Sequence, residues 1–417
     1  MPAYPKDLFR ALGPGIVYAA AAVGISHLVQ STRAGAVYGL SMALAMLVIF
    51  VIKYPALRIG SDYAAITGRH LIHDYQRQGR WVVYVVAAVT VVTMIFVMAS
   101  LALVTAGLLR AMTGTAWPDT AVAAVLLVLS SFTLVMGHYR LLEVISKVLV
   151  PMFTICILVA FCILTWQLDW RSAGGLVPAA DIRSVLFVVL LAGFMPTPLD
   201  GSILQSLWTC AKSGQMSTVP DRRAVRMDFN IGYVLSMVLA YCFLVMGASV
   251  FYQSGTALEG NAGLFAGQVI SLFTTAIGSW AFPLVAFAAF TVMFSTMLTI
   301  LDGYPRMLTV SVRQLRGESQ SGGEDRLFTM LVILNCIASV AVMLLLMKSF
   351  QAFIDFTSAL VFITGPLFAF LNHRAILGDA IPGEMKPGRL FRAWSMAGIV
   401  ILAVVAFAYL YIVVFFD

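Results

Sequence analysis

The chain has 417 residues, of which 61% are hydrophobic and 11% charged, and its formal net charge is +7. A soluble globular chain carries roughly 45–50% apolar and about 25% charged residues. The composition therefore excludes a cytosolic enzyme, a secreted disulfide scaffold and a disordered protein. The apolar residues form long blocks, and a helix of about 20 residues crosses a bilayer. The sequence thus predicts an all-α polytopic membrane protein.

Eleven membrane spans are expected, with no soluble domain between them. A further apolar stretch, 264–278, is short and is expected to lie at the membrane interface rather than cross. The eleven spans are 12–39, 41–59, 81–112, 119–137, 142–166, 184–211, 228–252, 280–303, 327–348, 351–372 and 390–416.

The loops predict the orientation of the chain. Lysine and arginine concentrate in alternate loops, and such an excess marks the cytoplasmic side. This places the N-terminus in the cytoplasm and, after an odd number of spans, the C-terminus on the outer side of the cell (plasma or inner) membrane. The positive net charge is thereby assigned to loops rather than to a nucleic-acid partner.

Two spans contain residues that interrupt a helix. Span one carries Gly24-Ile25-Ser26-His27, and span six carries Gly193 to Gly201, with prolines at 196 and 198. Each proline removes a backbone donor and clashes with the preceding turn. Broken backbone at membrane depth is tolerated where it is buried or lines a cavity. A pair of plain proline kinks is the alternative interpretation.

The positions of these breaks favour a transporter. They fall in the first and sixth spans, which are corresponding places of two five-span halves. That arrangement is typical of an inverted repeat with a substrate site at the bilayer midplane. The chain is accordingly expected to form a single transmembrane domain, with a first repeat at 1–166, a second at 184–372 and an extra helix at 390–416.

Around these breaks the sequence resembles the Nramp (natural resistance-associated macrophage protein) metal-transporter family. The resemblance implies the leucine-transporter-type fold of the APC superfamily, a 5+5 inverted repeat plus an eleventh helix that works by alternating access. It rests on Gly13-Pro14-Gly15, Ala34-Gly35, Tyr38-Gly39, Met195-Pro196, Tyr139 to Glu143, Ser295-Thr296, Leu301 and Gly303.

The departures from the family concern its metal ligands. Gly24 and His27 stand where the family has the Asp and Asn of its Asp-Pro-Gly-Asn motif, and Thr197 replaces the His of Met-Pro-His. Span three, 81–112, also lacks the interior carboxylates of the family's proton route. Divalent cations of the manganese or magnesium type need oxygen ligands and charge compensation. The resemblance therefore implies the fold, in a divergent bacterial-type member, more strongly than the usual substrate.

Polar residues at the breaks are the candidates for substrate contact, since ionisable residues inside a membrane are usually functional. His27 is either a ligand or proton acceptor, or a hydrogen-bonded core histidine. Ser26 and Thr197 either contact substrate or cap the following half-helix. Asp200 caps a half-helix, compensates a positive residue or binds a co-transported cation. The candidate set is Gly24, Ser26, His27, Gln30, Met195, Thr197 and Asp200.

Span eight is the candidate for a coupling-ion site. Ser295, Thr296, Thr299 and Asp302 are spaced to share one helical face. In the fold that the resemblance implies, hydroxyls of span eight that face carbonyls of span one often bind sodium. The alternatives are hydrogen bonds of these hydroxyls to their own helix and, for Asp302, an inner-gate ion pair with Arg306.

Other charged residues are expected to be structural. Glu143 and Lys147 are spaced to pair within span five. Arg33 either marks the outer end of span one or adds positive field there. Asp228 and Asp355 are expected to cap helices at the membrane interface.

These features predict a secondary-active transporter and not an enzyme. The sequence has no P-loop, no soluble nucleotide domain and no redox motif, and its five cysteines lack metal-ligand spacing. No cofactor is expected apart from a sodium ion. The favoured substrate is a small inorganic anion such as bicarbonate, driven by sodium. The alternatives are a divalent metal (Mn, Fe or Mg type), held by His27, Met195, Asp200 and carbonyls, and a small zwitterion. The oligomeric state stays open.

Overall fold

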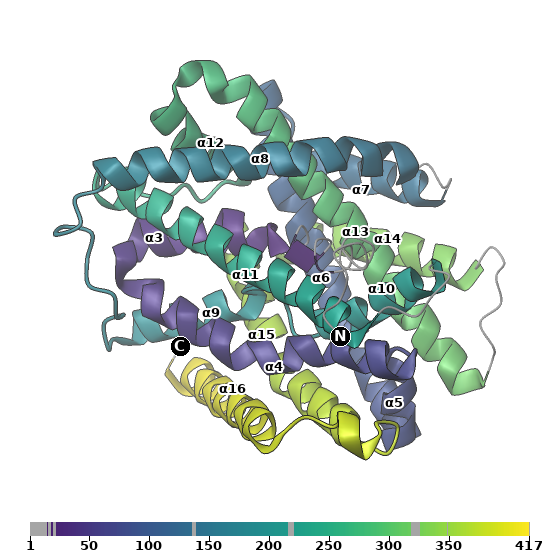
Figure 1. Cartoon of the computed structure of the whole chain (residues 1–417). Coiled ribbons are helices and arrows are strands. Elements are labelled where there is room, and N and C mark those ends of the chain that lie inside the picture. Colours follow the sequence, from purple (N-terminus) through teal and green to yellow (C-terminus); the bar gives the residue numbers. More distant parts are fainter. Residues whose placement is uncertain are drawn as a thin grey trace.

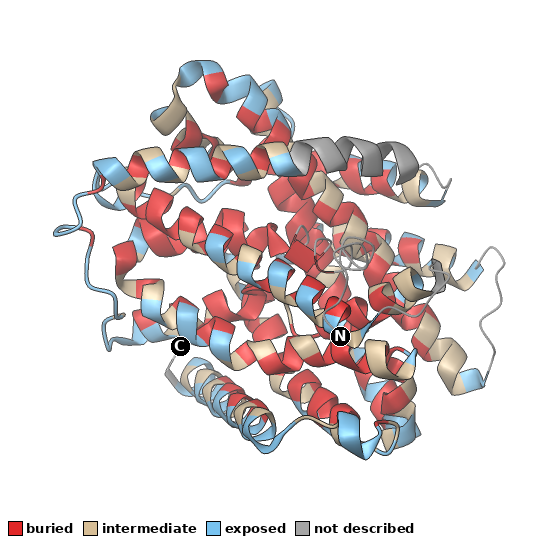
Figure 2. Ribbon diagram, in the orientation of Figure 1, coloured by how far each residue is buried: buried red, intermediate tan, exposed pale blue. Residues whose placement is uncertain are grey.

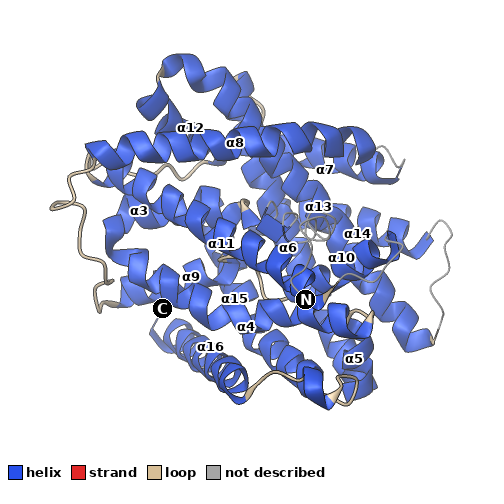
Figure 3. Cartoon of the chain, in the orientation of Figure 1, coloured by secondary structure: helices blue, strands red, loops and turns tan. Residues whose placement is uncertain are grey.

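The structure is a computed structural model, and in the part of the chain that it describes every regular element is a helix (Figure 3). Two features quoted above, Gly13-Pro14 and the Glu143–Lys147 pair, lie outside the described residues. Also outside are the remaining side chains of 139–150, 214, 215 and 416, and all of residues 1–14, 16–17, 20–21, 136–138, 216–220, 318–325, 348 and 417.

Within the described residues, each of the eleven expected spans overlaps one or more helical elements. In chain order the elements are η1 Ile25–Ser31, α3 Thr32–Tyr38, η2 Gly39–Met42, α4 Ala43–Thr67, α5 Leu71–Gln78, α6 Arg80–Thr113, α7 Asp119–Val135, α8 Tyr139–Gln167, α9 Ile182–Phe194, α10 Gly201–Gln215, α11 Arg222–Gly247, η3 Ala248–Tyr252, α12 Ala262–Ile277, η4 Ser279–Ala281, α13 Phe282–Arg316, α14 Arg326–Leu346, α15 Phe350–Leu377, η5 Gly383–Met385 and α16 Arg389–Phe416.

The helices follow from long apolar runs that end at capping residues. Within the described residues, seven helical stretches are long and apolar enough to cross a membrane, and shorter apolar helices include α7, α9 and α12. Asp181, Asn261 and Ser349 cap α9, α12 and α15 by accepting hydrogen bonds from free backbone amides of the first turn. The chain is therefore a multi-pass membrane protein.

The helices pack around α6 and α13 as one bundle. Helix α6 contacts α12, α13, α7, α14 and α15. Helix α8 lies on one side of the bundle and α16 on the opposite side, where α16 packs on α15 and α4 (Figure 1). Buried residues fill the middle, whereas many exposed residues follow the outer faces of α8 and α16 (Figure 2). The short apolar stretch at 264–278 belongs to α12, which packs against α6 and α8.

Glycine allows one close approach that positions the broken span. A Cβ atom on Gly193 in α9 would lie 2.1 Å from the carbonyl oxygen of Ser358 in α15. No side chain fits at that distance, so the backbones of α9 and α15 touch here. The last turn of α9 is thereby fixed against α15.

Both helix breaks expected from the sequence are present. In the first broken span, Val23 and Gly24 form a turn and the π-helix η1 follows. In the second, α9 ends at Phe194 and α10 begins at Gly201, and the Met195–Pro196 peptide bond is cis. We call the turn at Val23 and Gly24, with η1, the first break, and residues 195–200 the second break. The two lie close together, since η1 packs against α9.

Candidate functional site

The first break is held by hydrogen bonds of its own side chains. Ser26 Oγ lies 2.5 Å from the carbonyl oxygen of Ala22 and 2.7 Å from Nδ1 of His27. His27 Nε2 lies 2.7 Å from the carbonyl oxygen of Ser236 in α11. Because a carbonyl only accepts, Nε2 carries a proton and donates it. Both ring nitrogens of the fully buried His27 are thus engaged, as in the core-histidine interpretation.

The helix after the first break is connected to α15 by a series of polar side-chain contacts. Gln30 Nε2 donates to Ser358 Oγ over 2.8 Å, and Gln30 Oε1 accepts from Arg33 over 3.3 Å. Arg33 forms a two-pronged ion pair with Asp355, with distances of 2.5 and 3.0 Å. Its guanidinium also lies 5.6 Å from the ring centre of Phe187 in α9. One buried arginine therefore joins α3, α9 and α15.

The second break is held by a lysine from another helix. The ammonium of Lys53, in the interior of α4, donates to the carbonyl oxygens of Ala192 over 2.9 Å, Met195 over 2.8 Å and Thr197 over 2.6 Å. Carbonyls in the last turn of a helix have no partner within that helix, and Pro196 and Pro198 cannot donate. The three protons of the ammonium meet one carbonyl of the last turn of α9, the carbonyl of its capping residue Met195 and that of Thr197 between the two prolines, and Lys53 is only 2% exposed.

Sequence reasoning missed Lys53, although a signal was present. It is a lysine inside the apolar span 41–59, and an ionisable residue within a span is a functional candidate by default. The sequence alone does not say which backbone groups this lysine meets, because they come from a helix more than a hundred residues away.

Asp200 closes the second break on the side of α10. Its Oδ2 accepts a hydrogen bond from Tyr304 of α13 over 3.0 Å, and its buried Oδ1 has no hydrogen-bond partner among the described residues. Lys53 is near enough for its charge to attract that of Asp200. The hydroxyl of Thr197 donates to that of Tyr18 over 3.3 Å. The second break thus combines one ammonium, one carboxylate and several hydroxyls.

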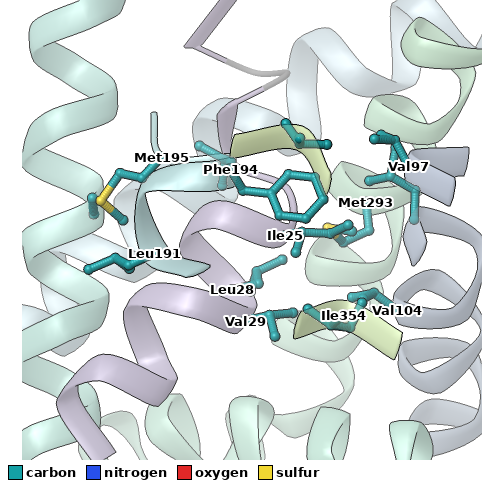
Figure 4. Packing of buried hydrophobic residues seen from close by; sticks show 14 of the residues in the cluster. Ile25, Leu28, Val29, Val97, Val104, Leu191, Phe194, Met195, Met293 and Ile354 are labelled. Carbon is teal, nitrogen blue, oxygen red and sulfur yellow. The ribbon is translucent and has the colours of Figure 1, made fainter. Parts of the chain in front are cut away.

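Apolar side chains fill the space between the two breaks. In Figure 4 the ring of Phe194 points toward Ile25 of η1, whereas Met195 points the opposite way. Met195 is fully buried and belongs to the hydrophobic core. Its sulfur therefore takes part in packing, while its carbonyl group faces the ammonium of Lys53.

The candidate residues of span eight lie in α13, and two of their hydroxyls bond to their own helix. Thr296 Oγ1 donates to the carbonyl of Val292 over 3.0 Å, and Thr299 Oγ1 donates to that of Ser295 over 2.9 Å. Thr296 is buried, whereas Ser295, Thr299 and Asp302 are partly exposed. Asp302 pairs with Arg306 over 2.5 Å. These are the contacts of the alternative interpretations, and the sodium site stays a prediction.

Two aspartates are not the helix caps that the sequence suggested. Asp228 is buried inside α11, and its Oδ2 accepts a hydrogen bond from the backbone amide of Gly15 over 2.6 Å. Asp355 lies inside α15 and pairs with Arg33. Both interpretations were wrong because Asp221 and Ser349, which directly precede α11 and α15, provide the caps instead. Each aspartate instead holds part of the first broken span.

The described residues offer little to a divalent metal ion. Nowhere in them do three or more His, Cys, Asp or Glu side chains come together to hold a metal. A cavity of about 370 Å³ lies between α4, α9, α15 and α16, but its lining side chains, which include Val48, Val188 and Ile401, are apolar. Such a lining does not stabilise an ion. The polar groups at the two breaks therefore remain the candidate site.

Comparison with known proteins agrees with this architecture. The family model described as natural resistance-associated macrophage protein-like matches residues 15–413. An uncharacterized protein of Pasteurella multocida (strain Pm70) is 31% identical over 376 residues, which cover 88% of this chain and 85% of that protein.

Solved transporter structures share the fold. The manganese transporter of Eremococcus coleocola superposes with a TM-score of 0.73 at 14% identity, covering 97% of this chain and 87% of that one. MhsT in complex with L-phenylalanine gives a TM-score of 0.61 at 13% identity, covering 95% and 97%. These structures confirm the leucine-transporter-type fold expected from the sequence, while identities this low show the fold alone.

Proposed function

Since this chain belongs to the natural resistance-associated macrophage protein family of secondary transporters, we propose that it carries a small inorganic anion, with bicarbonate as the first candidate. The main support for this proposal is the positive charge at the second break. There the protein places the ammonium of Lys53 against the three carbonyls of Ala192, Met195 and Thr197. A fixed positive charge in a buried, low-dielectric place attracts anions and repels cations.

The donors around the breaks suit an oxyanion. The hydroxyl of Tyr18, which accepts from Thr197, keeps its own proton to donate to an anion's oxygen atom, and the Lys53 ammonium attracts the anion through its charge. Asp200 opposes an anion, and the hydrogen bond that it accepts from Tyr304 spreads part of its charge. Under the proposal, a small anion reaches Lys53, which is 2% exposed in this structure, only when the break opens.

The divalent-metal alternative is the competing outcome of the test. The similar structure from Eremococcus coleocola is that of a manganese transporter. For this chain the proposed ligands would be His27, Met195 and Asp200. Both nitrogens of His27 already have partners, and a dication at the Met195 carbonyl would meet the Lys53 ammonium.

Sodium coupling is a separate part of the proposal. Ser295, Thr296, Thr299 and Asp302 are the proposed sodium ligands on α13. Their support is that they share one helical face and that hydroxyl and carboxylate oxygens suit a hard cation. If Asp302 is a ligand, sodium would have to displace the guanidinium of Arg306 from its carboxylate.

Uptake into proteoliposomes tests the substrate. Initial rates for labelled bicarbonate and labelled manganese are compared with protein-free liposomes, with and without an inward sodium gradient. We expect saturable bicarbonate uptake that the gradient stimulates and that Lys53→Ala abolishes. The matched control is Lys386→Ala, which removes one positive charge from a loop far along the chain from the breaks.

Two outcomes would contradict the proposal in different ways. Saturable manganese uptake that survives His27→Ala, without bicarbonate uptake, would refute the anion substrate. Bicarbonate uptake that neither the sodium gradient nor Thr296→Ala changes would refute the sodium site. It would still support the anion as the substrate.

A further inference from the structure

The ammonium of Lys53 occupies a place that is built like a cation site. We propose that Lys53 is a resident cation, tethered to α4, which keeps free cations out of the second break, and that removing its charge opens this place to a sodium ion. The inference rests on the proposed function only in taking the second break as the substrate site. It makes Lys53 the residue that decides the sign of the charge accepted there.

The oxygen atoms come from the end of a half-helix. Helix α9 stops at Phe194, so the carbonyls of Ala192 and Met195 have lost the amides that a continuing helix would supply. The C-terminal end of a helix also carries partial negative charge. Together with the Thr197 carbonyl, these groups surround one point at 2.6 to 2.9 Å from the Lys53 nitrogen.

The burial of Lys53 shows that the place requires a cation. Lysine is almost never fully buried unless it is paired, yet Lys53 is 2% exposed and forms no ion pair within 4 Å among the described residues. Its compensation comes from three carbonyl dipoles and from the more distant charge of Asp200. Taking Lys53 away leaves these carbonyls without a donor and Asp200 without its nearest positive charge.

Charge balance selects the ion that would replace the ammonium. Three carbonyls are neutral and Asp200 contributes one negative charge, so a single positive charge restores the balance. Carbonyl and carboxylate oxygens are ligands for hard cations. A sodium ion meets both conditions, whereas a divalent ion would leave one charge uncompensated.

A simpler role for Lys53 predicts a different result. If the lysine only fastens α4 to the second break, a neutral donor of similar length should serve in part, and sodium should have no effect. If the lysine is a resident cation, its neutral replacements should bind sodium. Lys53→Met keeps the apolar stem without a donor, and Lys53→Gln keeps a donor without charge.

The experiment measures the thermal unfolding midpoint of the full chain in detergent. Wild type, Lys53→Met, Lys53→Gln and the control Lys386→Met are compared in sodium chloride and in choline chloride at equal ionic strength. All four chains, including the one that is wild type at positions 53 and 386, also carry Thr296→Ala, which removes one ligand of the proposed sodium site on α13. A ligand that binds only the folded state raises the midpoint as its concentration rises.

We expect sodium to raise the midpoint of both Lys53 variants and to leave wild type and Lys386→Met unchanged. Lys53 variants that fold but do not respond to sodium would overturn the inference. Variants that fail to fold in either salt would overturn it as well, because a sodium ion filling the vacant place should restore folding. Bicarbonate uptake by wild type is a separate measurement, so failure of the proposed function is distinguishable from failure of this inference.

Discussion

The two helix breaks are stabilised in different ways. At the first break, Ser26 and His27 lie next to the turn in sequence and bond to Ala22 and Ser236 with neutral groups. At the second, the stabilising group is the charged Lys53 of another helix. The first break therefore depends on its own residues, and the second on the packing of α4 against α9 and α10. Two helix breaks at corresponding positions of the two halves can therefore be stabilised by different kinds of groups.

Lys53→Ala should produce the largest effect, because it removes the charge that holds the second break. Deleting it leaves three buried carbonyls without their donor, and each such unsatisfied group costs about 1–3 kcal/mol. We expect a loss of that order in the free energy of unfolding, measured in detergent by denaturant titration, together with loss of substrate uptake. A change below about 1 kcal/mol would mean that the break does not depend on Lys53.

His27→Ala should come next and should separate stability from transport. It removes both hydrogen bonds of a buried ring and leaves a cavity, at a cost of about 2–3 kcal/mol. If the first break is structural, His27→Gln should recover part of the stability, and the substrate concentration at half-maximal uptake should stay unchanged. A changed half-maximal concentration in the folded His27→Gln variant would show that the first break also contacts substrate.

Asp355→Asn should have a smaller effect, because the side chain of Asp355 is 29% exposed and that of Arg33 is 10% exposed. A partly exposed ion pair contributes less than a buried one, and we expect about 1–2 kcal/mol. A double-mutant cycle with Arg33→Gln measures the coupling between the two residues. Coupling near zero would separate the first broken span from α15.

Thr197→Val should have the smallest effect, since it removes one neutral hydrogen bond to Tyr18 of 3.3 Å. Such a bond contributes about 0.5–1 kcal/mol. The carbonyl of Thr197 remains available to Lys53 in this variant. A loss comparable to that of Lys53→Ala would contradict the view that the ammonium, rather than the hydroxyls, holds the second break.

The sequence was sufficient to predict the helices and both breaks, because these depend on neighbouring residues. Apolar blocks of about 20 residues predict spans, and Pro196 with Pro198 predicts the second break. Helix α11 starts at Arg222, six residues before the expected span at 228, because its polar first turns were read as loop, and Asp228 was therefore assigned to a helix end. Helix α15 starts within one residue of the expected 351, and Asp355 was assigned to its first turn as a cap because the pairing with Arg33 was not visible in the sequence.

The partners of buried charges could not be predicted in the same way. Lys53 bonds to groups about 140 residues away in sequence, and Asp228 bonds to Gly15 across 213 residues. Such pairings depend on how helices pack, and one sequence contains no direct record of packing. The absence of a carboxylate at Gly24 was visible, whereas the ammonium at the second break became visible only in three dimensions.

The contact of Gly193 with Ser358 has a mechanical consequence. Any side chain at position 193 would meet the backbone of Ser358. The turn of α9 that presents the Ala192 carbonyl to Lys53 and the turn of α15 whose Ser358 hydroxyl accepts from Gln30 are therefore in direct contact. A methyl group added at Gly193 would push these two turns apart and so disturb the supports of both breaks at once.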